Sequence, residues 1–184
     1  MAKKPEEAGT DVVDSDIAHT LMAESKIKSY TIATVGVSTV PVPLFDIAAV
    51  FAIQLRMIQQ LSNLYGRPFS ERAGRNIITA LGGGVLGYGA GFVVAASALK
   101  LIPGIGWAVG IASMPLVMGA STYAVGRSIV KHYEEGGSLF DFSADKMRAY
   151  YQEQFEKGKE LAAKAKAGLK SGGGQATEDV ATAA

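Results

Sequence analysis

Few residues of this chain could do chemistry, and they lie far apart in the sequence. The 184 residues include two histidines, His19 and His132, and no cysteine. Thiolate catalysis, disulfides and cysteine-based zinc sites are therefore excluded. Glu134 and Glu135 follow His132, a pattern more typical of an exposed helix end than of a metal site. The sequence contains no Gly-x-Ser-x-Gly elbow and no recognisable Ser/His/Asp arrangement, so it predicts no catalytic, metal or cofactor site.

The most regular motif is a row of small residues. Its members, four positions apart, are Thr79, Gly83, Gly87, Gly91 and Ala95. Residues four apart share one helix face, so the row predicts a groove at which two helices approach closely. Gly106 and Gly110 form a shorter row of the same kind. Two interpretations stay open: the rows form an oligomer or pore interface, or they let two helices of one chain touch.

The element that positions the longer row is an apolar segment. Residues 76–126 carry one charge, Lys100. The uncharged arms on either side of it have 24 and 26 residues, and about 20 helical residues cross a hydrocarbon core. Pro103 and Gly104 lie where a helical hairpin would turn. We predict a glycine-rich, membrane-embedded helical hairpin; a helix pair buried in a protein core is the alternative.

The charges that flank this segment predict its orientation. Arg67, Arg72 and Arg75 precede the segment, and Arg127 and Lys131 follow it. Positively charged residues favour the cytoplasmic side of a membrane. We therefore expect both termini in the cytoplasm.

A second expected element is an amphipathic helix over residues 46–65. Pro41 and Pro43 break the chain before it, and Asp46 can cap its first turn. Apolar residues gather on one broad face of this helix and mainly polar residues on the other. Asp46 is the one acid of an apolar region, so a buried functional carboxylate is the alternative to a structural cap.

The remaining sequence divides the chain into three parts. Residues 1–15 are polar and charged, which predicts a disordered N-terminus. Residues 16–157 form the expected helical domain, with a helix up to about Val40 and another capped by Ser143. The many β-branched residues in the uncharged run 29–45 leave a strand there as the alternative. Residues 158–184 are predicted to form a Lys- and Ala-rich helix end and a flexible tail.

Six short motifs follow one another through most of the chain. They are Val-Pro-Val-Pro-Leu-Phe-Asp (40–46), Gln-Leu-Arg-Met-Ile (54–58), Leu-Tyr-Gly (64–66), Pro-Gly-Ile-Gly (103–106), Thr-Tyr-Ala-Val-Gly-Arg (122–127) and Tyr-Glu-Glu-Gly-Gly (133–137). In this order they resemble the YcjF-like family, a bacterial domain of unknown function. Its members are often predicted membrane proteins, and some carry the domain behind an Era-like GTPase domain. The resemblance implies a bacterial inner-membrane protein and a GTPase partner acting in trans, because this chain has no P-loop of its own.

Composition narrows the classes of function further. Hydrophobic residues make up 48% of the chain, and 18 Lys and Arg nearly balance 17 Asp and Glu. Such a balance excludes a strongly basic nucleic-acid binder. We expect an all-α, membrane-associated, non-enzymatic structural or adaptor protein, with lipid, a GTPase and a second copy of itself as partners. The alternatives are an oligomeric pore built on the glycine row and a soluble helical interaction module.

Overall fold

A computed structural model describes residues 7–38, 45–88 and 106–182 of the chain, and throughout these ranges its regular structure is helical. The helices are α1 (Glu7–Val37), α2 (Phe45–Leu64), α3 (Glu71–Tyr88), α5 (Gly106–Glu134) and α6 (Ala144–Thr182). The expected all-α class is thus confirmed for the described ranges. The structure continues α1 into residues 1–15, which we expected to be disordered, and continues α6 to Thr182, where we expected a flexible tail. Adding a residue to an existing helix needs no new nucleus, so polar segments can extend a packed helix.

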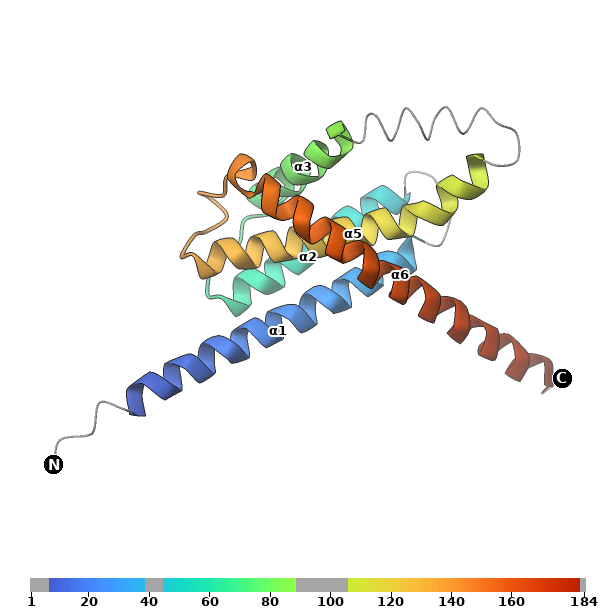
Figure 1. The fold of residues 1–184 in the computed structure, drawn as a ribbon, viewed down its shortest axis with the longest axis horizontal. Coiled ribbons are helices and arrows are strands. Elements are labelled where there is room, and N and C mark those ends of the chain that lie inside the picture. The colour runs from blue at the N-terminus through green and yellow to red at the C-terminus, as the bar shows by residue number, and fades with distance from the viewer. Residues whose placement is uncertain (1–6, 39–44, 89–105, 183–184) are drawn as a thin grey trace.

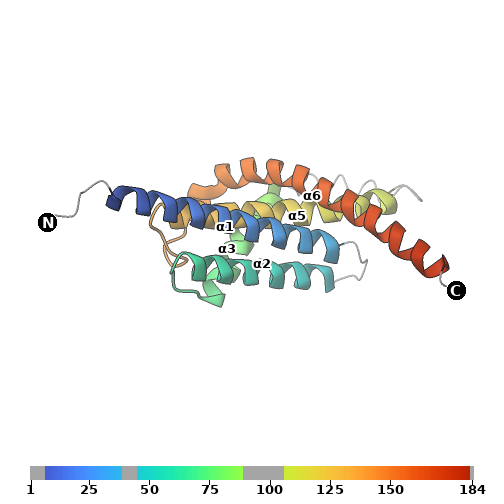
Figure 2. The same ribbon diagram turned by 90° about the horizontal axis from the view of Figure 1, so that it is seen from below.

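The helices form a bundle with α5 in its interior. α5 packs against α6, α1 and α2, while α3 lies against α2 and α6. Figures 1 and 2 show α1 and α6 running past the bundle at opposite ends, with the N-terminus at one end and the C-terminus at the other. The described part of the chain therefore has one shared core and two projecting helix ends.

The middle of the core belongs to α5. Its residues Ala120, Ala124 and Ile129 have no exposed surface. Buried side chains of the neighbouring helices complete the cluster: Ile27, Met57, Ile58, Leu61, Tyr151 and Phe155. Full burial of one large apolar side chain contributes roughly 1.5–3 kcal/mol. Pro115 is also fully buried, inside the same helix.

The expected membrane hairpin over residues 76–126 finds no support in this structure. Its turn, with Pro103 and Gly104, lies outside the described residues. Near its start, Ile77 and Ile78 of α3 join the bundle core, as do the α5 residues near its end. No helix in the described ranges is both long and apolar enough to cross a membrane. An apolar sequence predicts burial in lipid and in protein alike, and here other helices cover both ends of the segment.

The boundaries of α2 agree with the expected helix over residues 46–65. Asp46 lies in its first turn, where negative charge is favoured, while Pro41 and Pro43 lie outside the described residues. Gly66 follows the helix with a φ of 61°, a left-handed conformation that suits glycine. The expected extent of this helix is therefore confirmed, and a glycine follows its end.

Three glycines let the helices approach one another closely. A Cβ atom on Gly119 of α5 would lie 2.7 Å from Cγ2 of Val35, and one on Gly126 would lie 2.8 Å from Cγ1 of Ile27. On α6, a Cβ atom on Gly158 would lie 2.9 Å from the backbone Cα of Ala120. Because real Cβ atoms do not come so near, α1 and α6 can reach α5 only where these positions lack a side chain.

Gly158→Ala should therefore destabilise the protein by about 1–3 kcal/mol, the usual cost of overpacking a core. Its neighbour is the backbone of α5, which cannot move aside as a side-chain end can. The free energy of unfolding in urea measures the effect.

Gly168→Ala is the matched control on the same helix. A Cβ atom on Gly168 would meet nothing within 4 Å, so alanine should stabilise α6 by up to about 1 kcal/mol through helix propensity. Equal stability changes at the two glycines would contradict the close approach of α5 and α6.

Candidate functional site

The structure describes part of the predicted glycine row. Thr79 is exposed, and its hydroxyl donates a hydrogen bond to the carbonyl oxygen of Arg75 at 2.9 Å. Gly83 and Gly87 follow it within α3, and Gly106 and Gly110 lie in the first turns of α5. Gly91 and Ala95 lie outside the described residues. The row as a packing or oligomer interface therefore stays a prediction.

A chain of polar side chains crosses the interior of the bundle. The hydroxyls of Thr34 on α1 and Thr122 on α5 lie 3.1 Å apart, and Gln54 of α2 donates to Thr122 at 3.1 Å. The amide of Gln54 also lies 3.4 Å from the hydroxyl of Ser121, which bonds to the hydroxyl of Tyr151 on α6 at 3.1 Å. Four helices are thus joined by hydrogen bonds in a region of low dielectric constant, which fixes their register.

Tyr151 ends this polar chain in the buried interior of the bundle. Its side chain is 1% exposed. Burial raises its pKa to about 12, because the phenolate would lose its hydration, and the hydrogen bond with Ser121 lowers the pKa by a smaller amount. Tyr151 is therefore neutral at physiological pH and acts as a structural hydrogen-bonding group.

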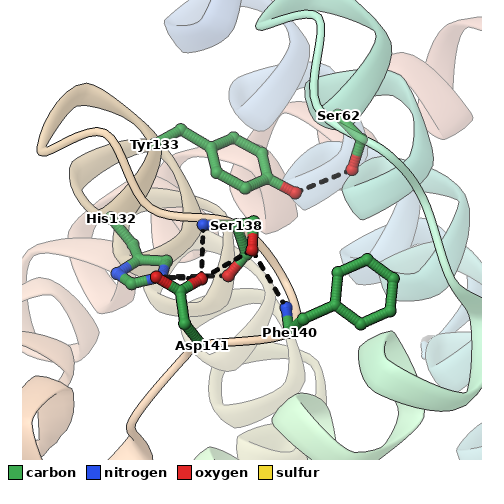
Figure 3. A network of polar contacts seen from close by, with 6 residues as sticks. All are labelled: Ser62, His132, Tyr133, Ser138, Phe140 and Asp141. Atoms are coloured by element: carbon green, nitrogen blue, oxygen red, sulfur yellow. Dashed lines mark hydrogen bonds and ion pairs between the residues drawn. The ribbon is translucent and has the colours of Figure 1, made fainter.

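The turn between α5 and α6 brings His132, Ser138 and Asp141 together (Figure 3). Ser138 donates to one carboxylate oxygen of Asp141 from its backbone nitrogen at 2.7 Å and from its hydroxyl at 2.6 Å. The Nε2 atom of His132 lies 3.0 Å from the carbonyl oxygen of Ser138 and 3.5 Å from Asp141. The chain bends back at Gly136, whose φ is 89°. A Cβ atom on Gly137 would collide with the His132 ring.

These are the three residue types of a hydrolase triad, but their bonding is different. In a triad the serine hydroxyl gives its hydrogen to the histidine. Here the Ser138 hydroxyl bonds to the carboxylate. The Nε2 atom of His132 must carry a hydrogen, because its partner is a carbonyl oxygen that can only accept. The corner therefore holds the turn in place, and its bonding provides no activated nucleophile.

Sequence reasoning missed this corner, because His132 was weighed against Glu134 and Glu135 as a metal ligand. No group of three metal-ligating side chains is found among the residues that the structure describes. Glu134 instead accepts a hydrogen bond from the hydroxyl of Tyr65 at 3.1 Å. The useful signal was Gly136-Gly137, which permits a tight return of the chain toward His132.

An open groove of about 690 Å³ lies between α2 and the start of α3. Apolar side chains line much of its floor: Ala48, Phe51, Ala52, Leu55 and Phe69. Arg56, Gln59, Glu71 and Arg75 form its polar border. The Arg75 guanidinium lies 5.5 Å from the centre of the Phe51 ring and binds Glu71 at 2.6 Å. The groove combines an apolar floor with two guanidinium groups and one carboxylate, a net charge of +1, which suits a ligand that is apolar and negatively charged.

Comparison with known protein families identifies the family of this helical bundle. The family described as "Domain of unknown function (DUF697)" matches residues 16–160, from within α1 to within α6. The chain belongs to this family. No solved structure matches it.

The chain is also similar to a curated bacterial protein, Magnetosome membrane protein 22 of Magnetospirillum gryphiswaldense. The two are 60% identical over 167 residues, which cover 91% of this chain and 84% of the relative. The similarity therefore extends beyond the bundle core to nearly the whole chain.

The ionisation of Tyr151 should be delayed in the folded protein. Its folded pKa of about 12 exceeds the ordinary value of 10.0, so its contribution to stability is complete below pH 10 and is lost as the pH rises toward 12. Tyrosinate absorbance, followed through an alkaline titration of the folded and the guanidinium-unfolded chain, checks this. In Tyr151→Phe, one fewer tyrosine should ionise at the high-pH end of the titration of the folded chain. The same number of late-ionising tyrosines in the variant would contradict the raised pKa of Tyr151.

The Asp141 clamp should weaken in acid. Its hydrogen bonds from Ser138 lower the pKa of this carboxyl from 3.8 to about 2. The carboxylate therefore stabilises the fold above pH 3.8, and this contribution is lost as the pH falls toward 2. Asp141→Asn should lower the melting temperature at neutral pH and lose this deficit near pH 2. A deficit that persists unchanged in acid would show that the ionised carboxylate is not the cause.

Proposed function

We propose that this chain is a non-enzymatic protein of a bacterial membrane compartment, in which the helical bundle acts as a structural or adaptor unit. The observation that carries the proposal is the relative named Magnetosome membrane protein 22, at 60% identity over 91% of the chain. Similarity of this extent favours a shared location, so we propose the magnetosome membrane for this chain as well.

The charge pattern of the sequence supports membrane contact. Between Arg75 and Arg127 the chain carries Lys100 as its one charge, and arginines stand on both sides of this stretch. We place the membrane contact at the apolar sequence that joins α3 to α5, and both termini on the cytoplasmic side. The bundle built from the described residues would then stand beside the membrane and present its surface to partners.

The bonding of the His132 corner supports a structural role for the one Ser/His/Asp group that the described residues bring together. Its serine is bound by Asp141 and its histidine faces a carbonyl oxygen. The narrower expectations from the sequence, namely YcjF-like membership, a GTPase partner in trans and self-association into an oligomer or pore, stay predictions.

Cell fractionation tests the location. A C-terminally tagged chain expressed in Magnetospirillum gryphiswaldense should be enriched in the isolated magnetosome fraction and should remain in the pellet after carbonate extraction. A tagged cytoplasmic protein is the control for carry-over. Recovery of the chain in the carbonate supernatant would contradict an embedded protein, and recovery in the cytoplasmic membrane alone would contradict the magnetosome.

A further inference from the structure

Arginine is concentrated in one part of this chain. Four of its six arginines fall within residues 56–75: Arg56, Arg67, Arg72 and Arg75. Glu71 is the one acidic residue in that range. The planar guanidinium group forms two parallel hydrogen bonds to a phosphate, which the ammonium group of lysine cannot do. The region where α2 meets α3 therefore has the charge and the donor geometry that suit phosphate.

Two of these arginines stand at the groove between α2 and α3. Arg75 is oriented by its ion pair with Glu71 and by the face of the Phe51 ring. Arg56 is exposed and donates to the amide oxygen of Gln59 at 2.7 Å. Among the residues that the structure describes, no carboxylate forms an ion pair with Arg56, so the charge of Arg56 is available to a ligand.

The floor of the groove suits a hydrocarbon chain. Phe51, Leu55 and Phe69 are partly buried side chains that pack against the core and also line the groove. Its volume of about 690 Å³ is within the range of about 300–1,000 Å³ that is typical of small-molecule sites. Apolar floor and cationic border thus occur in one cavity.

We propose that this groove binds one anionic phospholipid, with an acyl chain against Phe51, Leu55 and Phe69 and the phosphate between Arg56 and Arg75. The proposal rests on the membrane association proposed above. The groove also lies where the charged part of the chain ends, because residues 76–99 carry no charge. Basic pockets of membrane proteins on the cytoplasmic side bind lipid head groups in this way.

Titration calorimetry of the purified full-length chain tests the site without a bilayer. The probes are dihexanoyl phosphatidylglycerol and dihexanoyl phosphatidylcholine, both below their critical micelle concentrations, and inorganic phosphate. Saturable binding of one phosphatidylglycerol, at least about tenfold tighter than phosphatidylcholine or phosphate, is expected. The choline ammonium of phosphatidylcholine would face the same cationic border as its phosphate, and inorganic phosphate has no acyl chain to cover the apolar floor. Equal affinity for the two lipids, or no binding, would overturn the proposal.

Two variants place the binding in this groove. Arg56→Gln should weaken phosphatidylglycerol binding about tenfold, while Arg148→Gln removes the same charge from an exposed arginine on α6 that pairs with Asp145 and should leave binding unchanged. Ala52→Trp places a large side chain in the groove from an exposed position and should abolish binding. Ala80→Trp, at an exposed position beside a different groove, is its control.

The outcomes separate this proposal from the proposed location. If the chain stays in the magnetosome pellet but binds no phosphatidylglycerol, the proposed location stands and the proposed lipid site is wrong. If the chain binds phosphatidylglycerol through Arg56 but leaves the pellet in carbonate, the proposed lipid site stands and the embedded location is wrong. Equal losses in Arg56→Gln and Arg148→Gln would show that overall charge drives binding, and an acidic amphipathic peptide that binds through Arg56 in place of the lipid would point to a protein partner. Either result overturns the lipid site.

Discussion

Close contact between α5 and its neighbours is the constraint on which the rest of the bundle depends. Gly119, Gly126 and Gly158 remove the side chains that would hold α1 and α6 away from α5. At this separation the hydroxyl of Thr122 can reach α1 and α2 at the same time. Larger residues at the glycines would widen the gaps and leave buried polar groups without partners, a cost of about 1–3 kcal/mol for each group. The apolar packing of this core and the hydrogen bonding of its buried polar groups therefore depend on the same three glycines.

The same principle sets the groove between α2 and α3. A Cβ atom on Gly74 of α3 would lie 2.8 Å from Cδ1 of Leu55, so the first turns of α3 lie directly against α2. This contact brings Arg75 over the ring of Phe51 and makes one surface from two helices. The separation of α2 and α3 therefore determines both the width of the groove and the position of its charge.

Local sequence signals predicted the local structure well. The apolar periodicity predicted the extent of α2. Ser143 indeed precedes α6, and its carbonyl oxygen accepts a hydrogen bond from the backbone nitrogen of Met147 at 3.2 Å. Non-local features were out of reach. Apolar residues give the same signal whether lipid or protein buries them, so the sequence could not show that Ala120 and Ala124 lie in a helical core.

The candidate site was harder to predict, because it is assembled from separate segments. Arg75 was interpreted through its place before an apolar stretch, and nothing in its neighbours along the chain indicates Phe51 as a contact. The pairing of His132 with Asp141 likewise depends on a return of the chain that two glycines permit but do not specify. Small residues signal close packing only when the partner helix is known, which is why Gly158 was not singled out.

Pro115 interrupts the backbone hydrogen bonds of α5 within the helix. A proline has no amide hydrogen, so the helical bond to the carbonyl of residue 111 is missing, and the turns before it are held to the rest of the helix by fewer bonds. After Pro115 the helix enters the buried core; before it the chain leads back to the apolar stretch. The proline therefore separates the start of α5 from the packed part of the helix, whose contacts hold α1, α2 and α6 together.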